Sequence, residues 1–489
     1  MHRGYLTCPS CRRDYAINAG FFSCPAALPG EEHTLRRMLP WGPETMNEIR
    51  SAWAAGSGRT FKDLRPTLTA FHLLGQERYP RVLDTISEQF LRLEGKDFEV
   101  SPLIEAPELA SAIGRSGRLL IKNETNNLTG SHKGRHLMAT LLYLEALREM
   151  RGENAKKVLA IYSCGNAALG ASAVARAGGY ELHTFVPEDV DPIVADMLLE
   201  REANVKKIPR SVTGEGDPCY LAFRKALREQ GLIPFACAGN DNWSNIEGGA
   251  TLGWEVVMQL QAESRTVDHI VVQVGGGALA RGIAQAFGEA FHLGLIPAMP
   301  GIHACQPEGG FPFVRAHFLT LAEIARAGGI DFDLQYDRTA VPKDQLDSLL
   351  AFTRTRTDQM REAAEFAKIN FDSSPVQSIM RDLARQPGRF MWPWDGAAPH
   401  SLAHGILDDL TYDWYYILQA MLRTGGTAQA LSEETISRAY DSAQLHTGIP
   451  VCATGASGLA GLMQLTESGI IGPDESVALF FTGFDRSRA

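Results

Sequence analysis

The sequence has no apolar stretch close to the roughly 18 residues that a transmembrane helix needs. Its first eight residues also lack the apolar core of a secretion signal. No run of lysine and arginine is present, and 57 acidic residues outnumber 47 basic ones, which gives a net charge of −10. We therefore expect a cytoplasmic protein that binds small molecules and neither nucleic acid nor a membrane.

Cysteine is sparse and dispersed. Eight cysteines in 489 residues do not form the dense disulfide framework of small secreted domains, so we expect reduced thiols. Three of them have the spacing of half a zinc ribbon: Cys8, Cys11 and Cys24. Ala27 stands where a second CxxC motif would complete the site, so zinc would need another ligand such as His2 or His33. We expect residues 1–30 to be a degenerate, metal-free zinc-ribbon-like segment rather than a zinc site.

Internal repeats and low-complexity segments are absent as well, and the chain is long enough for globular domains with their own cores. Between residues 119 and 310, apolar runs alternate with helical stretches, which is typical of a parallel α/β sheet. The expected strands are 119–122, 158–162, 183–186 and 270–274, with a last one at 477–481. Residues 31–118, with helical signals at 47–55 and 81–93, are expected to be scaffold, and residues 311–400 contain no motif that indicates a function.

One turn places a lysine at the start of a helix. Residues 128–136 read LTGSHKGRH, in which Ser131 and its neighbours supply turn and N-cap chemistry. Leucines then recur at helical spacing, so we expect a helix from about His132, with Lys133 in its first turn. The positive end of the helix dipole disfavours an ammonium group there, which favours a nucleophilic amine. We interpret Lys133 as a Schiff-base lysine, although on spacing alone an exposed lysine at a helix start is the more common case, so other motifs must support the interpretation.

A second turn follows the expected strand at 158–162 and contains Asn166. In an open α/β sheet such a turn lies at the carboxyl ends of the strands, where ligands bind. An asparagine can donate to a phenolate oxygen, and the amide groups of a helix start can hold a carboxylate. Asn166 is therefore a candidate cofactor ligand, and Ser163 and Ala167 are candidate substrate contacts. An ordinary strand-to-helix turn is the alternative.

A third turn is rich in glycine and follows the expected strand at 270–274. Its sequence is Gly275, Gly276, Gly277, Ala278 and Leu279, with a helix expected from about Ala280. Glycines let the backbone approach an anion, and amide groups at a helix start can bind a phosphate without a lysine. The turn lacks the GxGxxG spacing of a dinucleotide site and the GK[ST] of a P-loop. A structural role for the glycines remains the alternative.

Thr482 ends the last expected strand, where its hydroxyl could face the same ligand-binding edge. If the ligand contains a pyridine ring, a hydroxyl beside the ring nitrogen does not stabilise the protonated ring as a carboxylate would. The ring is then a weaker electron sink, which suits elimination at a side-chain carbon better than transamination.

The lysine, asparagine, glycine turn and threonine follow one another in the order found in the fold type II family of pyridoxal-phosphate enzymes, which this sequence resembles. Within it the chain is similar to the threonine synthase branch, because residues 130–135 (GSHKGR) parallel that branch's GSFKDR. Residues 245–255 parallel its EG-x-x-T-x-x-x-E segment, and a cysteine-bearing start recurs there. The resemblance covers roughly residues 100–310 and 450–489.

The resemblance implies an α/β fold of the tryptophan synthase β type, with two open parallel-sheet domains and pyridoxal 5′-phosphate in the cleft. It places residues 31–134 and 246–489 in the large domain and residues 135–245 in the small one, and it implies a homodimer. By the same resemblance, Lys133 forms the internal aldimine and Asn166 binds the cofactor's O3′. The turn at 275–279 would bind the phosphate, and Thr482 would face the pyridine nitrogen.

The chain departs from the threonine synthase pattern beside the lysine, where His132 and Gly134 replace a phenylalanine and an aspartate. The LTGSxKGR type of segment makes it similar to the cysteate synthases of that branch, and residues 406–414 also look similar. The implied reaction is β-replacement on an O-phosphorylated amino acid such as O-phosphoserine. It would pass through an aminoacrylate, with a small nucleophile such as sulfite. Ser131, His132 and Arg135 are candidate substrate contacts, since a guanidinium suits a leaving phosphate.

Two other activities fit the same residues. One is threonine synthase itself, acting on O-phosphohomoserine, and the other is a dehydratase or ammonia-lyase. A cofactor-bearing binding protein without turnover is a further alternative of a different class.

Overall fold

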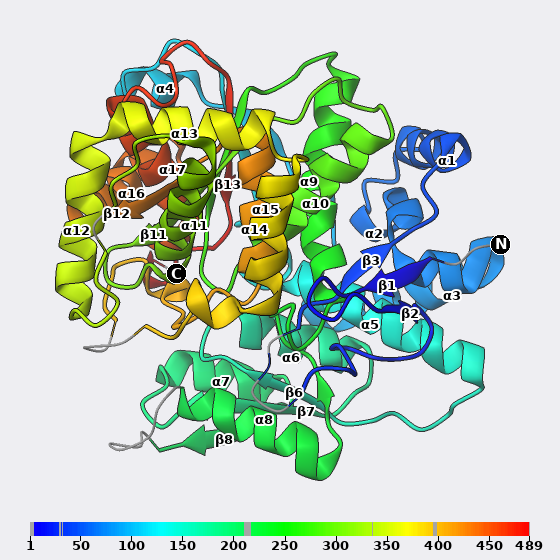
Figure 1. The fold of residues 1–489 in the computed structure, drawn as a ribbon. Helices are drawn as coiled ribbons and strands as arrows, with labels where there is room; N and C mark the ends of the chain where they lie inside the picture. Colours follow the sequence, from blue (N-terminus) through cyan, green and yellow to red (C-terminus); the bar gives the residue numbers. More distant parts are fainter. Residues whose placement is uncertain are drawn as a thin grey trace. The chain divides into compact units, whose positions relative to one another are not determined.

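The computed structural model describes residues 4–28, 31, 33–209, 217–334, 336–394 and 399–488. They form the predicted α/β protein, with parallel sheets (Figure 1). The chain divides into two units. Unit 1 contains Met1–Ser101, Asn126–Met258 and Gln285–Leu295, and unit 2 contains Pro102–Thr125, Gln259–Ala284 and Ile296–Ala489.

Unit 1 contains a four-stranded parallel sheet in the order β8-β7-β6-β9 and a small antiparallel sheet in the order β2-β1-β3. Its strands are β1 (Tyr5–Thr7), β2 (Asp14–Ala16), β3 (Arg36–Met38), β6 (Leu159–Tyr162), β7 (Leu182–Pro187), β8 (Asn204–Ile208) and β9 (Ile233–Pro234). Its helices are α1 (Pro43–Ala54), α2 (Thr60–Asp63), α3 (Thr69–Glu94), α5 (Lys133–Arg151), α6 (Asn166–Ala177), α7 (Pro192–Glu200) and α8 (Pro218–Gln230). Helices α6 and α8 pack on the parallel sheet (Figure 1).

The ends of these helices follow from local chemistry. Asp191 and Asp217 precede α7 and α8, and each side chain accepts a hydrogen bond of 2.8 Å from the backbone amide two residues later. A proline occupies the first turn of both helices, where its missing N–H costs nothing. Gly152 ends α5 in the left-handed conformation, with φ of 62°.

Unit 2 is built on a six-stranded sheet in the order β12-β11-β10-β13-β5-β4, parallel except for β4. Its strands are β4 (Leu103–Glu105), β5 (Leu119–Asn123), β10 (His269–Gln273), β11 (Gly301–Pro307), β12 (Ala428–Leu431) and β13 (Val477–Phe481). Its helices are α4 (Pro107–Ala112), α11 (Pro312–Gly328), α12 (Pro342–Thr355), α13 (Thr357–Ile369), α14 (Ser374–Arg385), α15 (Trp414–Thr424), α16 (Glu433–Thr447) and α17 (Ala453–Glu467). Helices α9 (Asn245–Ala262) and α10 (Ala278–His292) have residues in both units.

The segment 311–400, which carries no sequence motif, contains four of these helices, α11 to α14. Arg315 on α11 is fully buried, and its guanidinium lies 3.6 Å from the centre of the Trp392 ring. An arginine stacked on an indole in this way is held by cation–π attraction and dispersion. This arginine therefore belongs to the packing of unit 2.

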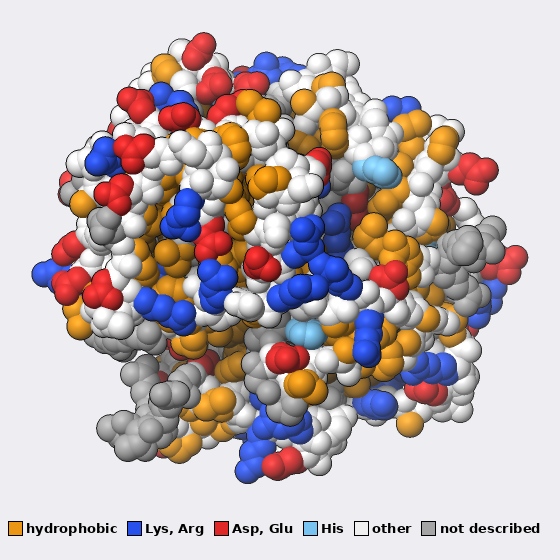
Figure 2. Space-filling view, viewed as in Figure 1, with side chains coloured by type: hydrophobic (Ala, Val, Ile, Leu, Met, Phe, Trp, Pro, Cys, Tyr) orange, Lys and Arg blue, Asp and Glu red, His pale blue; other side chains and the backbone are white. Residues whose placement is uncertain are grey.

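Each unit has its own hydrophobic core. None of the helices in the described part of the chain combines the length and apolar character needed to cross a membrane. Figure 2 shows basic and acidic side chains near one another over the visible face.

Candidate active site

The turn before Lys133 is strained. Thr129 has φ of 59° and Gly130 has φ of 70°, so two successive residues adopt the left-handed conformation. A β-branched residue such as threonine rarely does so, and strain of this kind gathers at functional sites. The Ser131 hydroxyl accepts a 3.4 Å hydrogen bond from the amide of Lys133, the first residue of α5. Ser131 and His132 are buried, while Lys133 is half-buried.

The turn that carries Asn166 lies in the same unit. Asn166 is the first residue of α6, and the residues from Ser163 to Ala167 are at least partly exposed. The Ser163 hydroxyl accepts from the amide of Gly165 at 3.3 Å. One turn into α6, a Cβ added to Gly170 would lie 3.0 Å from the amide nitrogen that follows Lys133. The structure thus brings the starts of α5 and α6 together, with Lys133 and Asn166 on adjacent helices.

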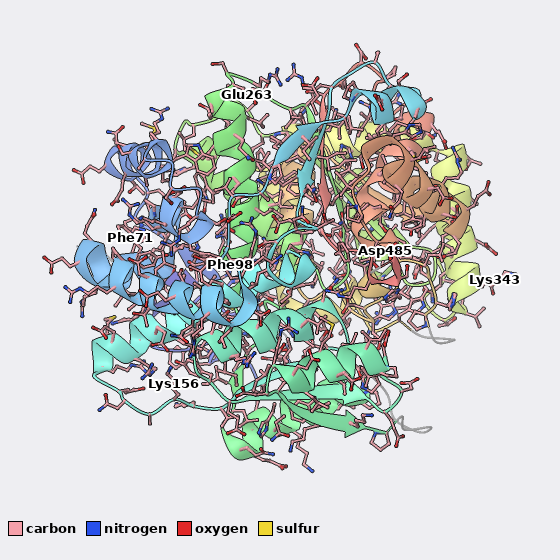
Figure 3. The ribbon with its side chains drawn as sticks, turned by 180° about the vertical axis from the view of Figure 1, so that it is seen from behind. Phe71, Phe98, Lys156, Glu263, Lys343 and Asp485 are labelled. Atoms are coloured by element: carbon pink, nitrogen blue, oxygen red, sulfur yellow. The ribbon has the colours of Figure 1, made fainter. Side chains whose placement is uncertain are left out.

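Gly134 is a glycine because an aromatic ring covers it. A Cβ at this position would lie 3.1 Å from the ring of Phe98, which makes edge contacts with Phe61 and Phe90 at centroid distances of 5.3 Å. Figure 3 labels Phe98. A side chain at residue 134 would require this buried ring to shift by a few tenths of an ångström, so the site favours glycine over the aspartate of the related sequence pattern.

Arg135, a candidate substrate contact, is fully buried in unit 1. Its guanidinium forms a buried ion pair with Glu255, with Nη1 to Oε1 at 2.6 Å and Nη2 to Oε2 at 3.2 Å, and both side chains have 0% exposure. Thr251 and Thr60 also accept hydrogen bonds from it. These contacts join the first turn of α5 to α9.

The segment 245–255 packs directly against the start of α5. The sequence indicated this segment only through its resemblance to the threonine synthase branch. A Cβ on Gly248 would collide with the carbonyl oxygen of Arg135, and a Cβ on Gly249 would collide with the His136 ring. The two glycines therefore permit close approach of the helices. Glu255 holds Arg135 from the same face of α9.

Glu247, in the same segment, belongs to a second buried network. It pairs with Arg37 at 2.8 Å, and Arg37 also reaches Glu289 at 3.2 Å. Thr69 donates to Glu247 through its amide at 3.1 Å and through its hydroxyl. Burial raises the pKa of Glu247, and the Arg37 charge and the Thr69 donors oppose that rise. Strand β3, which carries Arg37, is thereby attached to α9.

His136 lies one turn after His132, with ring centroids 5.5 Å apart. Its Nδ1 faces the Asn245 carbonyl at 2.9 Å, so Nδ1 carries the proton and donates. Burial, and then the nearby Lys133 charge, lower its pKa from 6.5 to about 3. His136 is thus a neutral packing residue at the start of α5.

The buried His136 should make unit 1 sensitive to acid. Between pH 6.5 and about 3 the unfolded chain protonates this histidine and the folded chain does not, so stability is lost as the pH falls through that range. His136→Asn keeps a donor near Nδ1 but cannot titrate. We expect it to reduce the average slope of unfolding free energy against pH by about 1 kcal/mol per unit between pH 7 and pH 5. Denaturant unfolding at pH 7 and pH 5 measures this, with exposed His404→Asn as the control. An unchanged slope in His136→Asn would contradict the assignment.

The glycine turn lies in unit 2, between β10 and α10. A Cβ on Gly275 would collide with the Asp408 carboxylate, and one on Gly276 would lie 3.0 Å from the Tyr412 ring. Gly277 has φ of 98°, in the range that favours glycine. The turn's carbonyls are used: Gly275 accepts from the Thr411 hydroxyl at 2.9 Å, and Gly276 accepts from the Asp413 amide at 3.0 Å.

The amide groups of this turn suit a phosphate. Ala278 is the first residue of α10 and Leu279 the second, and both are buried. The first amides of a helix have no partner within it, and the helix dipole adds positive potential there. Three glycines without side chains, with the carbonyls of Gly275 and Gly276 already bonded and a helix start directly after them, provide the chemistry that an anion requires. The residues present therefore fit the predicted phosphate-binding role.

Gly275→Ala should disturb this turn, because its new methyl group would meet the carboxylate of Asp408 and the backbone of Ile406. We expect loss of bound pyridoxal phosphate and destabilisation by about 1–3 kcal/mol. The control is Gly288→Ala in α10, where nothing lies within 4 Å of the added Cβ and helix propensity should improve. Cofactor content after dialysis measures the effect. Equal cofactor retention in both variants would rule out the proposed role.

Thr482 follows β13, and its hydroxyl accepts a 2.8 Å hydrogen bond from the side-chain amide of Gln273. That amide also donates to the carbonyls of Phe480 and Gly455 at 3.0 and 3.1 Å, which fixes its orientation. Strands β10 and β13 are parallel neighbours, so Thr482 and the glycine turn leave the same edge of the sheet. Sequence reasoning missed Gln273. The signal was a polar residue at the end of the otherwise apolar strand of β10.

The three predicted metal-ligating cysteines also lie together, in unit 1. Ligand atoms of Cys8, Cys11, Cys24 and His33 all lie within 4.8 Å of one another. His33 is one of the two histidines that the sequence offered as a fourth ligand, and His2 lies outside the described residues.

Comparison with known proteins gives one matching family model, described as pyridoxal-phosphate dependent enzyme, over residues 96–367. The chain is 23% identical to a threonine synthase of Methanosarcina acetivorans over 406 residues, covering 83% of this chain and 78% of that protein. It is 27% identical to a threonine synthase of Synechocystis sp. over 232 residues, covering 47% of this chain and 56% of that protein.

Solved structures share the fold. The processed form of threonine deaminase isoform 2 from Solanum lycopersicum superposes with a TM-score of 0.53 and 16% identity, covering 85% of this chain and 87% of that one. Diaminopropionate ammonia lyase from Escherichia coli superposes with a TM-score of 0.54 and 15% identity, covering 84% and 90%. At these identities the likeness shows the fold alone.

Proposed function

Because this chain belongs to the pyridoxal-phosphate dependent enzymes, we propose that it catalyses β-replacement on an O-phosphorylated amino acid such as O-phosphoserine. The family match and the threonine synthase relatives confirm the predicted fold type II family and its cofactor, pyridoxal 5′-phosphate. Sulfite is the candidate nucleophile. The reaction would exchange the phosphate on the β-carbon for sulfite and yield cysteate and inorganic phosphate.

The choice of β-replacement within the family rests on the glycine at position 134 and its surroundings. The sequence LTGSHKGR resembles the cysteate synthase type of lysine segment. The Phe98 ring lies against Gly134, so the aspartate of the threonine synthase pattern would require the ring to shift. The surroundings of Lys133 therefore differ from that pattern in shape as well as in charge.

When bound, pyridoxal phosphate supplies an aldehyde for the substrate's amino group and a ring that stabilises negative charge at the α-carbon. The Lys133 amine would hold the cofactor, and once freed it would remove and later return the α-proton of the substrate. The Asn166 side chain would donate to the phenolate oxygen. The amides of residues 275–279 would hold the phosphate, as at other helix starts.

Thr482 would set the electronic character of the ring. The Thr482 hydroxyl accepts a hydrogen bond from Gln273, which holds it at the end of β13, and a hydroxyl is a suitable neighbour for a pyridine nitrogen. A hydroxyl does not protonate that nitrogen, so the ring withdraws fewer electrons than in an enzyme with a carboxylate at this position. This favours departure of a β-substituent over transamination.

Substrate contacts would come from the two turns of unit 1. The partly exposed amides between Ser163 and Ala167, at the start of α6, suit the substrate's carboxylate. Ser131 and His132 flank Lys133, and His132 is the candidate donor to the leaving phosphate. We assign Arg135 a positioning role for α5, because its guanidinium is engaged by Glu255.

Product analysis tests the proposal. The holoenzyme is incubated with O-phosphoserine or O-phosphohomoserine, each with and without sulfite, and phosphate and amino acids are measured. We expect phosphate and cysteate only from O-phosphoserine with sulfite. Phosphate and threonine from O-phosphohomoserine would replace the proposal by threonine synthase activity. Phosphate and pyruvate without any effect of sulfite would indicate a lyase, and no turnover of either compound would indicate a binding protein.

Threonine synthase activity is the second candidate, since the curated relatives carry that name. The lyase alternative corresponds to the threonine deaminase and the diaminopropionate ammonia lyase among the structural neighbours. A homodimer, a cytoplasmic location and the division into domains at 31–134 with 246–489 and 135–245 stay predictions.

A further inference from the structure

Three cysteines and a histidine at the start of the chain have the geometry of a closed metal site. The ligand atoms of Cys8, Cys11, Cys24 and His33 lie within 4.8 Å of one another. The Sγ atoms of Cys11 and Cys24 are 3.7 Å apart. In a tetrahedral site with Zn–S bonds of about 2.3 Å, two sulfur ligands are separated by about 3.8 Å, which agrees with this distance.

The backbone around the cysteines holds them in place without a metal. The turn from Cys8 to Arg13 is closed by two hydrogen bonds, from the Arg12 amide to the Cys8 carbonyl at 2.8 Å and from the Cys8 amide to the Arg13 carbonyl at 3.1 Å. Arg12 adopts the left-handed conformation, with φ of 59°. A non-glycine residue accepts that conformation where the surroundings require it, and here it brings Cys8 and Cys11 to one side of the turn.

His33 is oriented as a metal ligand. Its Nδ1 is buried and has no hydrogen-bond partner among the described residues, while its Nε2 lies 3.4 Å from the Glu31 carboxylate. A histidine that binds zinc through one ring nitrogen commonly gives its other N–H to a carboxylate. Nδ1 is therefore the nitrogen that the site requires, and Glu31 is the group that orients the ring.

We propose that Cys8, Cys11, Cys24 and Nδ1 of His33 bind one zinc ion as a structural Cys3His site. All four positions are protein ligands, so no coordination position is left for water or substrate. We expected a metal-free segment because Ala27 stands where a second CxxC motif would place its second cysteine. In the proposed site, His33 supplies the fourth ligand instead.

The zinc would brace α5, the helix that begins at Lys133. The loop between β2 and Cys24 lies on this helix: the Tyr143 hydroxyl donates to the Ile17 carbonyl at 2.7 Å, and Arg151 donates to the Ala19 carbonyl at 3.0 Å. Trp243 holds the same loop, through its indole N–H to Phe21 at 2.7 Å and its amide to Phe22 at 3.0 Å. A metal that binds Cys11 and Cys24 fixes the end of this loop at Cys24 and the chain just before β2.

Metal analysis of the purified holoenzyme is the first test. We expect about one zinc per chain in protein produced with zinc in the medium, retained through dialysis. After removal of zinc under reducing conditions, Co²⁺ should restore one equivalent of metal and give the visible ligand-field bands of a tetrahedral thiolate site. Neither readout depends on catalysis. Substoichiometric zinc together with the absence of these cobalt bands would overturn the proposal.

Matched variants locate the site. His33→Ala and Cys11→Ser should each lose the bound zinc and lower the melting temperature. Their controls should do neither: His183→Ala, another histidine beside a glutamate, and Cys237→Ser, another partly buried thiol. Full zinc in both His33→Ala and Cys11→Ser would contradict the assignment of these ligands. Should a variant fail to fold, the zinc and cobalt content of the unaltered protein still decides.

Discussion

Lys133→Ala is expected to abolish turnover while leaving the fold intact. Lys133 is half-buried at the first position of α5, and its side chain has no ion pair among the described residues, so its loss should not unfold unit 1. The amine is proposed both to hold the cofactor and to move the α-proton. Removing the proton transfer alone should reduce kcat by a factor on the order of 10²–10⁴. Steady-state kinetics with O-phosphoserine and circular dichroism of the variant measure the two expectations.

Lys225→Ala is the matched control, because this lysine is exposed on α8. It should retain full activity. Reduction of the holoenzyme with borohydride followed by peptide mass spectrometry should find the cofactor attached to Lys133. Attachment to another lysine, or activity of Lys133→Ala within tenfold of the unaltered enzyme, would contradict the role of Lys133.

Glu255→Gln is expected to have the largest effect on stability. It removes the charge that compensates Arg135, and both side chains have 0% exposure. Breaking one partner of a buried ion pair typically costs about 3–5 kcal/mol, because the remaining charge is left uncompensated. Since this pair joins α5 to α9, the loss should also displace the start of α5. Denaturant unfolding gives the change in free energy, and cofactor content reports on the position of Lys133.

Two further variants separate the ion pair from a general effect of losing a carboxylate. Glu263, labelled in Figure 3, pairs with Arg265 at 2.9 Å on the surface, and Glu263→Gln should change stability by less than about 1 kcal/mol. The double variant Arg135→Met, Glu255→Leu removes both buried charges, so it should be more stable than Glu255→Gln alone. Equal destabilisation by the Glu255 and Glu263 substitutions would show that the buried Arg135–Glu255 pair matters no more for stability than a surface ion pair.

Three strands of the unit 2 sheet, β5, β10 and β13, could be predicted closely because their signal is local, whereas β4, β11 and β12 were not predicted. The last strand was expected at 477–481 and is Val477–Phe481, and the strand expected at 270–274 is His269–Gln273. Both are buried, so their apolar runs mark their length. The helix expected from about His132 begins at Lys133. Turn chemistry and apolar periodicity were sufficient there, since both act over a few residues.

Contacts between distant residues could not be predicted in this way. Arg135 and Glu255 are 120 positions apart, and nothing near either residue in the sequence indicates the other. Arg135 was therefore assigned to the substrate from its chemistry alone. The same limit applies to Gln273, whose contact with Thr482 spans 209 positions, and to the aromatic ring that favours glycine at position 134. Local pattern locates the candidate residues, while the tertiary packing decides which of them are structural.

The most direct test of the proposed reaction is the absorbance of the bound cofactor during sequential addition of O-phosphoserine and then sulfite. We predict that the cofactor band shifts on adding O-phosphoserine and returns to its starting position when sulfite is added, with neither change in Lys133→Ala. A band that does not respond to O-phosphoserine, but shifts with O-phosphohomoserine, would contradict β-replacement.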